Sequence, residues 1–156
     1  MRILLADDEK YGIERLLSEV KSALPDATID IFDDGIPALV AVHKEKYDLV
    51  ITDISMCGMN GDELAKCIHD YDPKVEILFE TGESEAELRQ KGIQPERCLL
   101  KPVKSIDIRA KLENLAGLPP FTMDVPEAAE KIHNKAAKIS IFTRLLRRGQ
   151  EDVRYG

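Results

Sequence analysis

The sequence predicts an α/β protein with a doubly wound parallel sheet, because two patterns alternate through the first 117 residues. Short apolar runs are separated by longer amphipathic segments, and each run is followed by one such segment. Apolar runs of this length are typical of parallel strands that are covered on both faces. Repeated strand–helix units favour an open sheet with helices on both sides. The expected strands are Ile3–Ala6, Thr28–Phe32, Leu49–Thr52, Val75–Phe79 and Cys98–Leu100.

The segments between these runs have helical periodicity. In the first, Ile13, Leu16 and Val20 recur at the spacing of one helix face, and Pro25-Asp26 ends the segment with residues that favour a turn. The helices are therefore expected at about 10–24, 34–46, 61–71, 84–91 and 104–117.

The last part of the chain has a different character. Gly117-Leu118-Pro119-Pro120 stops the last of these helices, which predicts a domain over 1–118 and an extension over 119–156. Asp124-Val125-Pro126-Glu127 has the pattern of a helix start, and apolar residues then recur at helical spacing. This predicted helix could pack on the domain, pair with a second copy in a homodimer, or begin a longer output region.

Composition narrows the class of protein. The 156 residues are 44% hydrophobic and 33% charged, which is ordinary for a globular domain. The net charge of −7 disfavours direct binding of nucleic acid. No apolar stretch is long enough to span a membrane, and the start lacks the pattern of a signal peptide. Three cysteines without a paired spacing favour a reducing compartment, so a cytoplasmic location is expected.

Polar residues follow the predicted strands and supply the candidate site. Asp7 and Asp8 come after the first strand, Asp53 after the third, Thr81 after the fourth and Lys101 after the fifth. In open α/β sheets the carboxyl ends of the strands meet at one edge, where ligands bind. Three carboxylates at that edge suit a hard divalent cation such as Mg²⁺, whose charge would offset their repulsion.

The stretches "ADDE", "VITDISMCGMNGDEL", "FETG" and "LLKP" resemble the receiver domain of two-component response regulators. The likeness covers about residues 1–117. It implies a flavodoxin-like sheet with strand order 2-1-3-4-5. It also implies that Asp53 accepts a phosphoryl group from a phosphohistidine on a sensor histidine kinase or a phosphotransfer protein.

The resemblance also assigns roles to the neighbouring residues. Asp8 would bind Mg²⁺ directly, Asp7 would bind it through water, and the Ser55 backbone carbonyl would complete the protein ligands together with the acceptor. Thr81 would hydrogen-bond the aspartyl phosphate, and Lys101 would form an ion pair with it. Such a protein takes part in its own phosphorylation and dephosphorylation and is not otherwise an enzyme.

Three residues depart from the family pattern. Cys57 stands where a proline is usual, and Gly82 stands where an alanine is usual. Cys98 stands three residues before Lys101, where the family commonly has tyrosine or phenylalanine. In the family that aromatic ring moves inward when the threonine moves, and a cysteine side chain is too small to reproduce the movement.

The function expected from these residues is a phosphoacceptor switch that signals through contacts with a downstream protein. One alternative is a phosphorylation-independent scaffold built on the same fold, and another is the N-terminal part of a longer regulator. A small metal-dependent phosphatase is weaker, because no histidine is placed to act near Asp53. His133 is expected to be a surface residue, since no companion helices accompany it to form a phosphotransfer bundle.

Overall fold

The structure is a computed structural model that describes residues 1–115, 117 and 121. The chain divides into a unit over Met1–Asp124 and a second unit over Val125–Gly156, and all the described residues belong to the first. The amphipathic helix expected within 119–156, and the homodimer it might form, lie outside the described residues.

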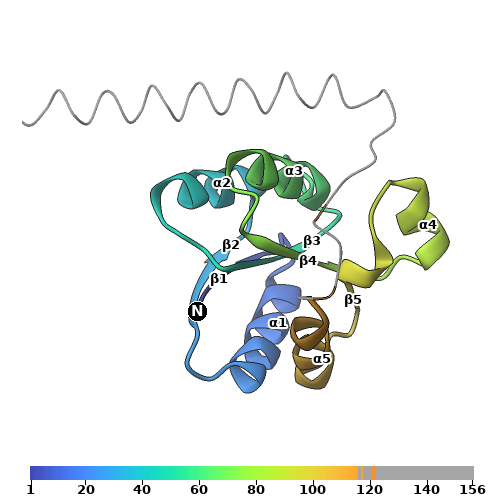
Figure 1. Ribbon diagram of the computed structural model, residues 1–156, viewed down its shortest axis with the longest axis horizontal. Coiled ribbons are helices and arrows are strands. Elements are labelled where there is room, and N and C mark those ends of the chain that lie inside the picture. Colours follow the sequence, from blue (N-terminus) through green and yellow to red (C-terminus); the bar gives the residue numbers. More distant parts are fainter. Residues whose placement is uncertain (116, 118–120, 122–156) are drawn as a thin grey trace, which may run out of the picture. The chain divides into compact units, whose positions relative to one another are not determined.

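A five-stranded parallel sheet forms the centre of the first unit, with the order β2-β1-β3-β4-β5. This confirms the predicted fold class and strand order. In Figure 1, α1 and α5 lie on one face of the sheet and α2 and α3 on the other, while α4 stands beside β5. The elements are β1 (Arg2–Ala6), α1 (Lys10–Ala23), β2 (Thr28–Phe32), α2 (Gly35–Lys44), β3 (Leu49–Asp53), α3 (Gly61–Tyr71), β4 (Glu76–Thr81), α4 (Glu85–Gln90), the 3₁₀ helix η1 (Pro95–Arg97), β5 (Cys98–Leu100) and α5 (Ser105–Leu115).

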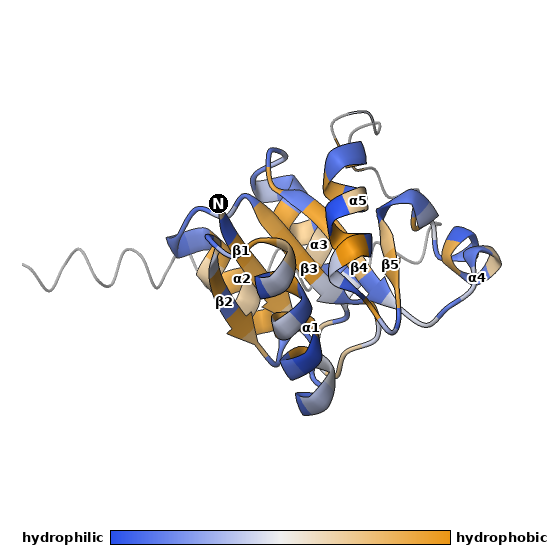
Figure 2. Cartoon of the chain, turned by 90° about the horizontal axis from the view of Figure 1, so that it is seen from below, coloured by the Kyte–Doolittle hydropathy of each residue, from blue (hydrophilic) through white to orange (hydrophobic). Residues whose placement is uncertain are grey.

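An apolar cluster lies between the sheet and the pair α1 and α5. Leu5 and Ile51 of the sheet, Leu16 of α1 and Ile108 of α5 are all members, and none is more than 1% exposed. In Figure 2 the strands, coloured mostly orange for hydrophobic residues, lie behind these two helices. Burial of apolar area on this scale is the main source of stability for a domain of this size.

Strand β2 differs from its prediction as a buried strand. It pairs only with β1 and lies at the edge of the sheet, so Ile31 is 45% exposed. Asp30 in the same strand accepts hydrogen bonds from the Arg2 guanidinium at 2.8 Å and from the Tyr47 hydroxyl at 2.8 Å. An apolar run alone does not distinguish an edge strand from a central one, because pairing partners are decided by topology.

Two of the helices begin with a reciprocal capping box. In α3 the Asn60 side chain pairs with the backbone of Glu63, whose carboxylate accepts from the Asn60 backbone N–H at 3.0 Å. In α4 Ser84 and Glu87 make the equivalent pair. Both caps satisfy N–H groups that a helix start leaves unpaired, and they place these starts next to the ends of β3 and β4. Among the described residues, no helix is long and apolar enough to cross a bilayer.

Candidate functional site

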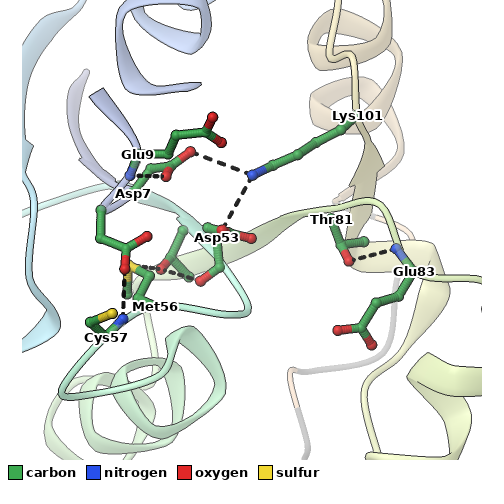
Figure 3. Close-up of polar contacts among 10 residues, drawn as sticks. Asp7, Glu9, Asp53, Met56, Cys57, Thr81, Glu83 and Lys101 are labelled. Carbon is green, nitrogen blue, oxygen red and sulfur yellow. Dashed lines mark hydrogen bonds and ion pairs between the residues drawn. The ribbon is translucent and has the colours of Figure 1, made fainter. Parts of the chain in front are cut away.

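The carboxyl ends of β1, β3, β4 and β5 bring the predicted site residues together. Asp53 and Thr81 are the last residues of β3 and β4, and Asp7 and Lys101 directly follow β1 and β5. Figure 3 shows Asp7, Asp53 and Lys101 pointing toward one another at this edge. Asp7, Asp53 and Lys101 thus lie together at the carboxyl edge of the sheet, whereas Thr81 points elsewhere.

Lys101 connects the two innermost carboxylates. Its ammonium nitrogen lies 3.2 Å from Asp53 Oδ2 and 3.5 Å from Asp7 Oδ2, although Asp7 and Lys101 are 94 positions apart in the chain. The Asp7 side chain is fully buried, and those of Asp53 and Lys101 are 14% and 23% exposed. Because solvent screens charges weakly here, the ammonium has a strong effect on both carboxylates.

The pKa values at the site reflect this partial burial. Burial raises the pKa of the Asp53 carboxyl, and the Lys101 charge opposes that rise without cancelling it. Burial alone would lower the pKa of Lys101, but the surrounding carboxylates of Asp53, Asp7 and Glu80 outweigh it and raise that pKa. Lys101 therefore stays positively charged beside Asp53, the carboxylate that would receive an anionic group.

Asp7, Asp8 and Asp53 form an acidic cluster whose oxygen atoms lie within 4.8 Å of one another. The second oxygen of Asp7 accepts from the Glu9 backbone N–H at 2.7 Å, and Asp8 Oδ2 accepts from the Cys57 backbone N–H at 2.7 Å. The hydrogen bond from Cys57 lowers the pKa of Asp8. Carboxylate oxygens held in this way suit a hard divalent cation of the Mg²⁺ class.

The chain after β3 stays close to the cluster. The Ser55 backbone N–H makes a hydrogen bond to the Asp53 carboxylate, so this loop bends back over the strand end. Gly61, the first residue of α3, donates its N–H to the Ile54 carbonyl at 2.9 Å. A Cβ at Gly61 would lie 1.9 Å from the Asp53 carbonyl oxygen, so glycine is required for the helix to approach this closely.

Thr81 is oriented away from the acidic cluster. Its hydroxyl oxygen accepts from the Glu83 backbone N–H at 3.0 Å, and Figure 3 shows this bond on the side away from Asp7. Glu83 in turn forms an ion pair with Lys91, which directly follows α4. Because the Thr81 oxygen is the acceptor in this bond, its O–H remains available to donate to another group.

Glu80 is a buried carboxyl that was not predicted from the sequence. It is the register partner of Asp53 on the neighbouring strand and is fully buried, and neither side-chain oxygen has a hydrogen-bond partner among the described residues. Burial raises the pKa of Glu80 to about 7, with the Lys101 charge opposing the rise. A signal was present in the sequence, since a glutamate interrupts the apolar run of β4 directly before Thr81.

The cysteines behave as small side chains. Cys98 is 5% exposed and lies opposite Phe79 in the sheet, and burial raises the pKa of its thiol to about 12. A thiol with this pKa is almost entirely protonated at neutral pH and is a poor redox group. Cys57 is exposed in the loop after β3, and Cys67 is partly buried in α3.

Comparison with known proteins decides the family. The sequence model of the response regulator receiver domain matches residues 3–113, which is well over half of the chain. The chain belongs to this family. It is 32% identical to the response regulator receiver protein CpdR of Brucella abortus, over 73% of this chain and 95% of CpdR.

Two further relatives show the range of proteins that contain this domain. The sensor protein EvgS of Escherichia coli is 32% identical over 74% of this chain, but the match spans only 10% of EvgS. Sporulation initiation phosphotransferase F of Bacillus subtilis is 34% identical over 58% of this chain and 72% of its own length. A chemotaxis protein CheY4 structure from Vibrio cholerae has a TM-score of 0.60 and 25% identity, and the match covers 73% of this chain and 97% of that one.

The protein is thus a receiver domain of two-component signalling. Receiver domains act as phosphoacceptors, and they interact with histidine kinases or with phosphotransfer proteins. No catalytic enzyme family is indicated by the matches.

Proposed function

We propose that Asp53 is the phosphoacceptor of this receiver and that a phosphohistidine on a sensor kinase or phosphotransfer protein is the donor. The observation that carries the proposal is the position of Lys101, whose ammonium lies 3.2 Å from Asp53 and 3.5 Å from Asp7. An anionic phosphoryl group can approach an aspartate only where a cation offsets the repulsion. A downstream protein would then recognise the phosphorylated form.

The transfer needs no general base. An oxygen of the ionised Asp53 carboxylate forms the new bond to phosphorus, while the bond from phosphorus to the histidine nitrogen breaks and its electron pair stays on the nitrogen. The protein contributes by holding the acceptor in line and by stabilising negative charge on the transferring group. Lys101 serves the second role, because it is a fixed cation beside the acceptor.

The acidic cluster fits a magnesium ion. Asp7, Asp8 and Asp53 would hold the ion, with the Ser55 backbone carbonyl as a further ligand, because their oxygen atoms are close together and of the preferred type. Bound Mg²⁺ supplies positive charge that stabilises the transferring phosphoryl group. The Thr81 hydroxyl, at the end of the adjacent strand, would leave the Glu83 N–H and hydrogen-bond the phosphoryl oxygen after transfer.

Phosphorylation with a small-molecule donor tests the assignment. Incubation with acetyl phosphate and Mg²⁺ should add one phosphoryl group to the wild-type chain, as measured by intact-protein mass spectrometry. Asp53→Asn should remove the added mass, because an amide is not a nucleophile for this transfer. Removal of Mg²⁺ with EDTA should suppress it as well.

The matched control is Asp26→Asn, which changes an exposed aspartate in the turn after α1 in the same way. This variant should be phosphorylated as fully as wild type. Retention of the added mass by Asp53→Asn, with the label mapped to another residue, would show that the acceptor is misassigned.

A further inference from the structure

Phe121 packs on the face of the sheet opposite to α5, although it lies only six positions after the end of that helix. Its side chain is 5% exposed. The ring centroid lies 6.0 Å from that of Phe79 in β4 and 5.4 Å from that of His69 in α3, and the Arg97 guanidinium carbon lies 5.8 Å from it. We call Phe79, His69 and Arg97 the Phe121 cradle.

The cradle lies on the α3 side of the sheet. Leu78 belongs to the core under α1 and α5, and side chains alternate along a strand, so Phe79 points to the other face. His69 lies in the last turn of α3, which covers that face.

The cradle is connected to the candidate phosphorylation site by two routes. Phe79 lies two residues before Thr81 on the same strand and on the same face. The second route runs from the Thr81–Glu83 hydrogen bond to the Glu83–Lys91 ion pair. Lys91 ends α4, and α4 contacts η1, whose last residue is Arg97.

Cys98 occupies the position on β5 where the receiver family commonly has an aromatic ring. It is the β5 residue opposite Phe79, and it offers no ring to fill space when Thr81 moves. The buried ring that covers Phe79 comes instead from Phe121, outside the strands of the sheet. An aromatic group beside β4 is therefore present, but it belongs to the segment after α5.

We propose that Phe121 anchors the segment after α5 to the receiver and that phosphorylation of Asp53 loosens this anchor. The proposal rests on Asp53 being the acceptor. Movement of Thr81 toward the phosphoryl group shifts the end of β4 and breaks the bond with Glu83. Phe79, two residues earlier on the same strand face, then moves against the Phe121 ring that covers it.

Coupling of this kind is reciprocal, because each event changes the free energy of the other by the same amount. Loosening by phosphorylation means that an intact anchor opposes the phosphorylated conformation. Coupling between sites commonly amounts to a change of about tenfold in an equilibrium constant.

Hydrogen–deuterium exchange on the full chain tests the proposal. Beryllofluoride with Mg²⁺ mimics the phosphoryl group, and it should increase amide exchange in the peptide that contains Phe121 by about tenfold. Phe121→Ala should show this faster exchange without beryllofluoride and should gain little more on adding it. Tyr71→Ala removes an aromatic ring that is 46% exposed at the end of α3, and it should respond as wild type does.

A second readout uses the absence of tryptophan from this chain. Phe121→Trp introduces a single tryptophan, which can be excited selectively at about 295 nm. Its emission should shift to longer wavelength, and its ring should become more accessible to acrylamide, when beryllofluoride binds. Asp53→Asn in the same background should abolish the shift.

The outcomes separate the two proposals. If beryllofluoride changes exchange near Asp53 but leaves the peptide containing Phe121 and the introduced fluorophore unchanged, the anchor proposal is overturned and the acceptor assignment stands. If beryllofluoride changes exchange nowhere, the acceptor assignment fails and the anchor proposal fails with it.

Discussion

The two faces of the sheet are built differently. Under α1 and α5 the core is continuous, and two hydrogen bonds connect these helices: the Arg109 guanidinium donates to the Ser22 carbonyl at 2.6 Å, and the Ser105 N–H donates to Glu19 at 2.7 Å. The exception on this face is Glu80, whose two buried carboxylate oxygens have no hydrogen-bond partner among the described residues. On the other side α4 is a short helix that stands out beside β5 in both Figures 1 and 2. There, several buried polar atoms lack a hydrogen-bond partner among the described residues: Asp62 Oδ1, His69 Nδ1, Glu83 Oε2 and Gln94 Oε1.

This difference separates a supporting face from a face that can rearrange. A short helix with one buried residue, such as α4, opens at lower free energy than long helices packed on a continuous core do. The α1–α5 face holds β1 and β5 and therefore keeps Asp7 and Lys101 in register. The α3–α4 face contains the groups that must move, Thr81 and Glu83, and also the Phe121 cradle.

The largest expected effects are losses of folding stability caused by two truncations, one on each face of the sheet. Ile108→Ala in α5 should lower the free energy of unfolding by about 4 kcal/mol, because a fully buried side chain in a continuous core leaves a cavity. Leu88→Ala in α4 should cost about 2 kcal/mol, because the short helix can shift to fill the space. Urea denaturation measures both. Equal losses at unchanged m-values would show that the two faces are equally well packed.

The next effect concerns Glu80, the buried carboxyl on the α1–α5 side. Its pKa is raised to about 7 in the folded protein, so the folded state binds its proton more tightly than the unfolded state does. The stabilisation is complete below the unfolded pKa near 4.5 and is lost as the pH rises through about 7. The loss should approach about 3 kcal/mol in metal-free buffer.

Glu80→Gln should remove this loss, because the amide has the same shape and does not ionise. Stability measured against pH in the presence of EDTA would show it as a flatter profile between pH 5 and about 8. Glu14→Gln, which changes an exposed glutamate in α1, serves as the control and should keep the wild-type slope. A slope that survives in Glu80→Gln would mean that another group titrates in this range.

The smallest effect is expected at the ion pair between Glu83 and Lys91. Their side chains are 21% and 44% exposed, so solvent screens the interaction. A double-mutant cycle with Glu83→Gln and Lys91→Met should give a coupling of about 0.5 kcal/mol. A coupling several times larger would show that the α3–α4 face is held more firmly than its unpaired polar atoms indicate.

Much of the fold and of the candidate site could be predicted before any coordinates. Alternating apolar runs and amphipathic segments specify parallel strands and helices through local periodicity, and each strand and helix predicted within the first 117 residues is present with shifts of a few residues at its ends. The site residues could be predicted for the same reason, because the positions of Asp53 and Lys101 are set by the strand ends next to which they lie. The exposure of β2 could not be predicted from its apolar run, since it depends on which strands pair, although the strand order implied by the family resemblance already places this strand at the edge.

The sequence by itself determined the order of strands and helices and the set of charged residues at the strand ends, because short-range patterns encode both. Only the tertiary structure decided that Glu80 is buried beside Asp53 with no hydrogen-bond partner in the described part of the chain, and that Phe121 covers Phe79 from the segment after α5. These features arise from contacts between residues that are distant in the chain. Such contacts leave no periodic trace, because burial depends on what the folded chain brings nearby.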